Sequence, residues 1–276
     1  EEGGGIDPVA IGLVAAAAVI HASWNWALHV EGDRVAALTV AGLAAGVLLL
    51  PAMLARPPFA VAPLIVLSAL FQTGYALALA AAYRRGALSV AYPIGRGTAP
   101  LLVTLGGLAV LGQRPGSLAL AGAIALACGL GLIGLAGWRA DQRGAVGFAL
   151  LAGTGIAGYS LVDARAVQSV WPPAYLGATL LIEGALLTLR LRLDPAGPRL
   201  VGRLRDSLGI GIVIAFGTVA AYLLVLFAFQ RSAAGRVSTM REASVVIGLM
   251  LAREGVGARV WVGAALVALG AILAAG

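Results

Sequence analysis

The feature that most constrains this chain is a succession of apolar runs, each long enough to cross a lipid bilayer. Crossing about 30 Å of hydrocarbon takes about 20 apolar residues in a helix. The runs cover residues 8–29, 35–55, 62–83, 87–111, 117–137, 145–166, 174–190, 208–229, 235–252 and 258–275. Glycine, proline and arginine mark the breaks between them, as turns require. The pattern predicts an all-α membrane protein with ten transmembrane helices.

The composition supports this class and excludes others. Hydrophobic residues make up 61% of the chain and charged residues 11%, whereas a soluble domain carries about 25% charged residues. The net charge of +7 comes from arginine, because the sequence contains no lysine. No basic soluble face is expected, so we exclude nucleic acid as a partner.

Neither a cofactor nor enzymatic activity is expected. The single cysteine, Cys128, lies in an apolar run, and no second thiol or histidine cluster suggests a metal site. The phosphate-binding pattern GxxxxGK[ST] and the zinc pattern HExxH are both absent. Ser23 and His21 are two residues apart and point to different faces of a helix, so they do not predict a hydrolase. The first residues, EEGGGIDP, lack the basic start of a cleavable signal peptide.

The two halves of the sequence resemble each other. Residues 75–87 (YALALAAAYRRGA) align with residues 222–234 (YLLVLFAFQRSAA). Further on, Gly122 aligns with Gly263 and Gly129 with Gly270. We therefore expect two five-helix units, residues 1–140 and 141–276. An odd number of helices gives the two units opposite topologies, and inverted repeats of this kind are typical of transporters, with the site near the midplane.

The repeated blocks also carry a family resemblance that covers almost the whole chain. AAYRRGALSVAYPIGRGTAPLLV (81–103), VSTMREASVVIGLMLAREGV (237–256) and HASWN (21–25) resemble the EamA-type repeat of the drug/metabolite transporter superfamily. The resemblance implies ten helices in two inverted repeats around a cavity lined mainly by the first, third, fourth, sixth, eighth and ninth helices. It also implies a multi-pass protein of the bacterial inner membrane.

The resemblance leaves the substrate open. Amino acids, drugs, sugars and nucleotide sugars are all carried within the superfamily, and aromatic amino-acid exporters are among its ten-helix bacterial members. This chain departs from the family at Gln113, where many members carry an acidic residue after the fourth helix. Glu254 occupies the matching place in the second repeat.

The first segment places polar side chains at membrane depth, where they are costly and usually functional. His21 and Asn25 are four residues apart and share a helix face, which Trp24 adjoins. One interpretation is a substrate-facing patch in which the imidazole and amide donate hydrogen bonds and the indole stacks. The other is a hydrogen bond between helices together with an interfacial tryptophan.

Arginine occupies equivalent places in the two repeats. Arg96 lies near the middle of the fourth segment, following Tyr92, and Arg241 and Glu242 are its counterparts in the ninth. An arginine fork suits a substrate carboxylate or phosphate. The alternative is a structural ion pair, for example between Arg96 and Glu242. The sequence favours neither.

Further polar residues complete the predicted substrate site. Tyr159 and Asp163 share a face of the sixth segment, Gln72 and Tyr75 share a face of the third, and Tyr222 lies on the eighth. Glu183 is ionisable at depth, but the seventh helix is not expected to line the cavity. For Glu183 we therefore expect a structural partner.

These residues predict a monomeric secondary transporter, an exporter of small organic metabolites working by alternating access in the lipid bilayer. Five aromatic side chains and the arginines favour aromatic amino acids, and the lack of an acid between Asp7 and Glu31 argues against cationic drugs. Phosphorylated or nucleotide sugars, drugs, or a non-transporting sensor or scaffold are the alternatives. A proton could serve as coupling ion through His21, Asp163 or Glu242.

The predicted orientation is in conflict. The resemblance implies cytoplasmic termini, yet most loop arginines fall on the side opposite the termini, including five in residues 190–205. Cytoplasmic loops of membrane proteins are usually rich in arginine and lysine. By this rule alone the arginine-rich side would be cytoplasmic and the termini would lie outside.

Overall fold

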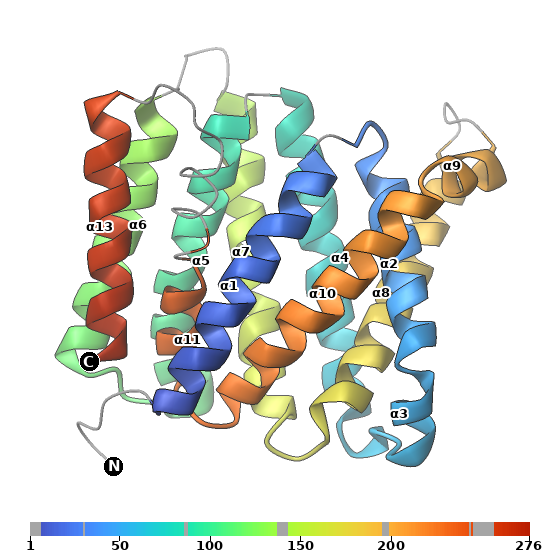
Figure 1. The fold of residues 1–276 in the computed structure, drawn as a ribbon, viewed down its shortest axis with the longest axis horizontal. Coiled ribbons are helices and arrows are strands. Elements are labelled where there is room, and N and C mark those ends of the chain that lie inside the picture. The colour runs from blue at the N-terminus through green and yellow to red at the C-terminus, as the bar shows by residue number, and fades with distance from the viewer. Residues whose placement is uncertain are drawn as a thin grey trace.

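The protein is a bundle of roughly parallel and antiparallel helices (Figure 1). The computed structural model describes residues 7–29, 31–85, 88–136, 143–194, 199–242, 244 and 257–276. In these residues the helices are α1 (Pro8–His29), α2 (Arg34–Leu48), α3 (Leu50–Ala55), the short 3₁₀ helix η1 (Phe59–Val61), α4 (Ala62–Arg85), α5 (Leu88–Leu111), α6 (Ser117–Ala136), α7 (Arg143–Ala166), α8 (Pro172–Arg192), α9 (Leu200–Asp206), α10 (Leu208–Phe229), α11 (Ala234–Arg241) and α13 (Ala258–Ala275).

Local sequence signals set several helix ends. Pro8 opens α1, and the carboxylate of Asp7 accepts a hydrogen bond from the Val9 N–H. Asp33 caps α2 in the same way, because its carboxylate accepts the Ala36 N–H at 3.1 Å. After α5, Gly112 takes a positive φ of 66°. Glycine adopts this left-handed conformation without steric cost, so the chain turns there.

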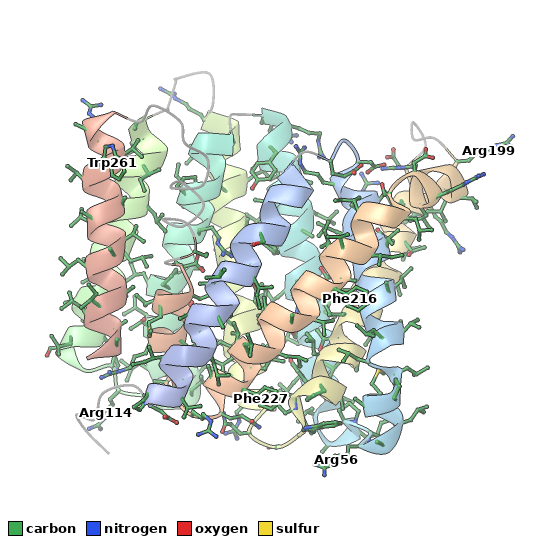
Figure 2. The ribbon with its side chains drawn as sticks, viewed as in Figure 1. Arg56, Arg114, Arg199, Phe216, Phe227 and Trp261 are labelled. Atoms are coloured by element: carbon green, nitrogen blue, oxygen red, sulfur yellow. The ribbon has the colours of Figure 1, made fainter. Side chains whose placement is uncertain are left out.

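Seven helices of the described part are long and apolar enough to cross a membrane: α4 with η1, α5, α6, α7, α8, α10 and α13. Their outward faces carry large apolar side chains, among them Phe216 on α10 and Trp261 on α13, which are 59% and 56% exposed (Figure 2). Such surfaces are unfavourable in water and suit lipid. The chain is therefore an all-α, multi-pass membrane protein.

The described parts of the predicted segments overlap helices, with two differences. The short helix α9 lies between the predicted segments 174–190 and 208–229, where the sequence predicts none. The run 35–55 is divided at Leu49 into α2 and α3, since Leu49 leaves helical geometry and Pro51 follows. In contrast, α5 continues through Pro93 and Pro100. Most of the ninth segment, including Glu254, lies outside the described residues.

The most extensive helix contacts join segments that are far apart in the sequence as well as neighbours along the chain. α6 packs on α13, α2 on α8, α4 on α7 and α1 on α10. Glycines bring α6 and α13 together: a Cβ on Gly122 would lie 2.7 Å from the Gly270 carbonyl oxygen, and one on Gly129 would lie 2.5 Å from that of Gly263. Such close contacts between small residues are typical of helix association in lipid.

The start of α1 and the end of α13 lie on the same side of the bundle (Figure 1). Arg56 and Arg114 are on this side, and Arg199 is on the opposite side (Figure 2). These three arginines lie on the sides that the sequence predicts for them.

Candidate functional site

A cavity of about 90 Å³ lies inside the bundle. It is bounded by α1, α2, α4, α5, α7, α8 and α10. The side chains that line it are His21, Leu38, Ala41, Gly42, Gln72, Tyr75, Arg96, Tyr159, Leu180, Glu183, Thr218, Ala221 and Tyr222. Six of these are predicted site residues, and they come from five helices: α1, α4, α5, α7 and α10. The lining combines a basic side chain, an acidic side chain and several aromatic rings, and ionisable residues are rare at membrane depth.

Three tyrosines form one wall of the cavity. The rings of Tyr75 and Tyr159 meet edge to face with centroids 6.1 Å apart, and those of Tyr159 and Tyr222 do so at 5.9 Å. Edge-to-face pairs within about 7 Å are favourable. Because the rings come from α4, α7 and α10, their packing holds three helices around the cavity.

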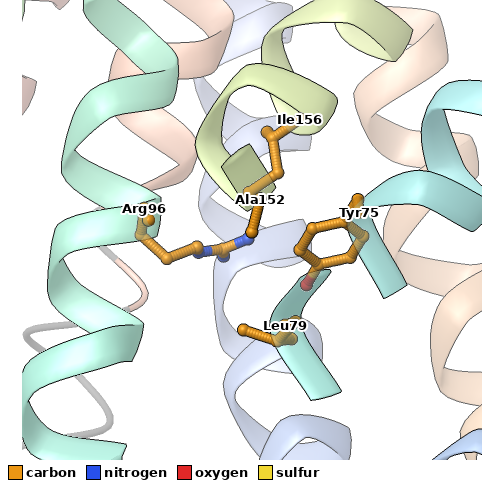
Figure 3. A pocket seen from close by; sticks show the side chains of 6 residues that line it. Tyr75, Leu79, Arg96, Ala152 and Ile156 are labelled. Carbon is orange, nitrogen blue, oxygen red and sulfur yellow. The ribbon is translucent and has the colours of Figure 1, made fainter. Parts of the chain in front are cut away.

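Arg96 reaches into the space between α4 and α7. Figure 3 shows its guanidinium extending from α5 toward Ala152, with Tyr75 and Leu79 on the far side. Next to Arg96, α5 and α7 are in close contact, because a Cβ on Gly95 would lie only 3.0 Å from the Ala149 carbonyl oxygen. The side chain of Arg96 is 3% exposed.

Arg96 belongs to a buried charge cluster that includes the ion pair with Glu242, one of the two alternatives that the sequence leaves open. Its Nε lies 2.7 Å from Oε2 of Glu242, and the Nε of Arg241 lies 3.4 Å from Oε1 of the same carboxylate. Nη2 of Arg96 is also 3.5 Å from the Ser244 hydroxyl. Glu242 is fully buried and Arg241 is 3% exposed. The cluster holds two cations and one anion.

Asp163 lies behind the tyrosine wall and is fully buried. Its Oδ1 accepts hydrogen bonds from Ser68 at 2.5 Å and Tyr175 at 2.6 Å, and its Oδ2 accepts one from Tyr222 at 2.5 Å. Gln72 in turn donates to the Ser68 hydroxyl at 3.1 Å. Three hydroxyl donors suit an ionised carboxylate, which can only accept. The network connects Asp163 to the cavity through Tyr222 and Gln72.

One expectation about the lining is wrong. The sequence predicts a structural partner for Glu183 and does not predict that its helix, α8, lines the cavity, yet Glu183 lines it. No hydrogen bond or ion pair of its carboxylate is found among the described residues. The physical reason is that α8 packs closely on α2 at Gly184. Glu183, the preceding residue, therefore points in another direction and faces the cavity.

The remaining predicted residues are placed less completely. Arg241, Glu242 and Asp163 are behind the lining and contact it through Arg96 and Tyr222. Trp24 and Asn25 lie on α1 and Tyr92 lies on α5, but their side chains fall outside the described part of the structure. Gln113 accepts a hydrogen bond from the Ala234 N–H at 3.0 Å and so caps the start of α11.

Sequence reasoning missed three contributors to the site. Ser68 and Tyr175 bind Asp163, and Thr218 lines the cavity. Ser68 lies four residues before Gln72, so it shares a helix face with a predicted site residue, a signal that could have found it. Tyr175 and Thr218 carry no comparable signal, since tyrosine and threonine are ordinary residues of transmembrane helices.

Fold and site together define a helical, multi-pass membrane protein with a cavity between its helices that is lined by both apolar and polar side chains. No model of a known protein family matches the sequence, and no curated protein matches it. Among solved structures, one described only as "Crystal structure of protein" has a TM-score of 0.74, with 96% of each chain covered at 18% identity. At this identity the likeness shows a shared fold and nothing about substrate.

Proposed function

We propose that this protein is a secondary transporter, an exporter of small organic metabolites in the bacterial inner membrane, with amino acids and especially aromatic ones as substrates. The observation that carries the proposal is the cavity within the bundle that is lined by Arg96, Glu183 and three tyrosines. Glu183 is eleven residues into α8, or about 17 Å along the helix axis, so the cavity is near the middle of the bundle. Ionisable residues at this depth usually mark a substrate or ion pathway.

The contact pattern supports ten helices in two inverted repeats. If α1–α6 and α7–α13 are the two units, the contact of α4 with α7 is equivalent to that of α10 with α1. Likewise, Gly122 aligns with Gly263 in the sequence but packs on Gly270, while Gly129 packs on Gly263. This exchange of equivalent positions is what a two-fold axis between antiparallel units produces. In such folds substrates bind between the repeats.

Arginine and aromatic residues support a substrate with a carboxylate and a ring. Arg241 is buried, and its Nη2 has no hydrogen-bond partner in the described residues. The charge cluster therefore retains a donor for an additional anionic group. The tyrosine wall offers ring edges and faces on which an aromatic side chain could stack.

The size of the cavity supports a mechanism by alternating access. Its volume of about 90 Å³ is well below the roughly 300–1,000 Å³ of sites that bind small molecules. The helices must separate before an amino acid can enter. Rocking of one repeat against the other would open the cavity to each side in turn, and a proton is the proposed coupling ion.

Other functions would use the same features differently. Phosphorylated or nucleotide sugars would also engage the arginines, and a drug transporter would depend on the apolar lining. A non-transporting sensor or scaffold is favoured by the complete hydrogen bonding of Asp163 and by the Arg96–Glu242 pair. A sensor or scaffold would give no role to the cavity or to the carboxylate of Glu183 that lines it.

Ligand-dependent melting of the purified protein tests the proposal. We expect phenylalanine or tryptophan to raise Tm, because a ligand that binds only the folded state stabilises it. Arg96→Ala and Arg241→Ala should each abolish the shift, whereas Arg199→Ala, a change at an exposed arginine, should preserve it. If both buried-arginine variants keep the shift, the proposed carboxylate site is wrong. No shift with any amino acid in the wild type would favour the scaffold.

A further inference from the structure

Glu183 is the acidic side chain of the cavity lining that the proposed carboxylate site does not use. It comes from α8 and faces the same space as His21, Gln72 and Tyr222. Within the described residues its carboxylate has neither a hydrogen bond nor an ion pair. Asp163 is different, because three hydroxyls surround it. Glu183 is thus the carboxylate of the cavity with binding capacity still available.

Helix packing fixes the direction of Glu183. A Cβ on Gly42 of α2 would lie 3.1 Å from the Cα of Gly184, and one on Gly184 would lie 2.7 Å from the backbone nitrogen of Leu43. The two helices therefore touch backbone to backbone at Gly184. Successive residues of a helix point about 100° apart, so contact at Gly184 turns Glu183 away from α2 and toward the cavity.

One basic and one acidic side chain line the cavity from helices in different parts of the bundle. Arg96 belongs to α5, which packs on α6 and α7, and Glu183 belongs to α8, which packs on α2 and α4. The aromatic wall and Gln72 complete the lining between them. An unpaired charge at the centre of a membrane protein costs about 2.5–3.5 kcal/mol on insertion scales. A ligand that brings the opposite charge offsets this cost.

We propose that Glu183 binds the ammonium group of the substrate while Arg96 receives its anionic group, so that the site selects zwitterionic amines. This inference rests on the proposed transport function and names the group that would separate amino acids from other carboxylates. A charge-assisted hydrogen bond between an ammonium and a carboxylate, formed in a desolvated cavity, gives both affinity and selectivity. A substrate lacking its ammonium leaves the Glu183 carboxylate buried and unpaired.

Three matched ligands distinguish the contribution of the ammonium group from that of the carboxylate. Phenylalanine carries both groups, 3-phenylpropionate lacks the ammonium and phenethylamine lacks the carboxylate. We expect wild-type protein to bind phenylalanine at least about tenfold more tightly than either analogue. Glu183→Gln should weaken the binding of phenylalanine by about tenfold or more and leave the binding of 3-phenylpropionate unchanged. Kd is measured by calorimetry or by the shift in Tm with ligand concentration.

Two further variants keep the result interpretable. Glu183→Asp retains the charge and should keep part of the preference for phenylalanine, whereas Asp206→Asn, an acid-to-amide change at an exposed position of α9, should keep all of it. Tm without ligand shows that each variant is folded.

The outcomes distinguish this inference from the proposed function. The proposed role of Glu183 is overturned if the Glu183→Gln protein binds phenylalanine as tightly as the wild type does. It is also overturned if the change weakens the binding of phenylalanine and of 3-phenylpropionate equally. In both cases the transport proposal stands. If the wild type binds 3-phenylpropionate as tightly as phenylalanine, zwitterion selection is overturned. If the wild type binds neither of them, nor tryptophan or alanine, both the inference and the proposed amino-acid substrate are overturned.

Discussion

Arg96 and Glu242 form an ion pair in the interior of the bundle, with Nε and Oε2 2.7 Å apart and neither side chain more than 3% exposed. The pair joins α5 to the end of α11, two segments more than a hundred residues apart in sequence. Arg241 contacts the same carboxylate. Glu242 therefore compensates two arginines at once, and the stability of the centre depends on it.

Glu242→Gln is expected to destabilise the protein strongly. Removing one partner of a buried pair leaves an uncompensated charge, at a cost of about 3–5 kcal/mol. Thermal unfolding in detergent should show a large fall in Tm. The matched control is Arg231→Gln, which breaks the exposed pair of Arg231 with Asp7 and should leave Tm nearly unchanged. Equal effects of the two changes would show that the buried pair has no special role.

The two tyrosines that donate to Asp163 should differ in their effects. Tyr175→Phe and Tyr222→Phe each remove one donor to a buried carboxylate, which costs about 1.5–3 kcal/mol. Tyr222 also lines the cavity, and Tyr175 is not among the lining residues. We expect both variants to lower Tm but Tyr222→Phe alone to weaken ligand binding. Loss of ligand binding in Tyr175→Phe would instead mean that Asp163 itself governs the site.

The interface of α6 and α13 should tolerate a methyl group at one glycine and not at another. A Cβ on Gly129 would come within 2.5 Å of the Gly263 carbonyl oxygen, whereas one on Gly131 meets nothing within 4 Å. Gly129→Ala should lower stability by about 1–3 kcal/mol through overpacking. Gly131→Ala should be neutral or slightly stabilising because alanine favours helix. A Gly129→Ala protein as stable as the wild type would contradict the close packing of these helices.

A pH-dependent contribution is expected at the start of α2, outside the membrane-spanning segments. Partial burial raises the pKa of Asp33, but hydrogen bonds from the Arg203 guanidinium and the Ala36 N–H more than offset this and hold the pKa below its usual 3.8. A carboxyl whose pKa is lower in the folded state stabilises the protein above the unfolded pKa and stops doing so as pH falls through the folded value.

Asp33→Ala should therefore lower Tm at pH 7, by the equivalent of about 0.5–2 kcal/mol for a lost helix cap. The difference from the wild type should shrink as the pH is lowered below about 4. Melting both proteins between pH 7 and pH 3 measures this. A difference that stays constant across the range would exclude a role for the ionised Asp33 carboxylate.

Much of the fold could be predicted from sequence because the bilayer imposes length and apolarity on each crossing. The run 208–229 coincides with α10, and 8–29 coincides with α1. The break between α2 and α3 could not be predicted in this way, since both sides of Leu49 are equally apolar.

The site could be predicted in part, and the errors of the prediction have a physical cause. Polar residues inside apolar runs, such as Arg96 and Gln72, stand out against their surroundings, and the structure brings them to one cavity. Glu183 stood out equally, but the direction in which it points depends on the contact of Gly184 with α2, which the sequence does not reveal. Pairing across the bundle, as between Tyr175 and Asp163, depends likewise on tertiary structure.

Transport by the protein in liposomes tests the central claim most directly. Proteoliposomes containing wild-type protein would be supplied with radiolabelled phenylalanine, tryptophan and alanine, each with and without a proton gradient. We expect saturable uptake with phenylalanine and tryptophan exceeding alanine, stimulation by the gradient, and loss of uptake in Arg96→Ala but not in Arg199→Ala. Uptake no greater than in protein-free liposomes for all three amino acids, under both conditions, would contradict the proposed amino-acid transport.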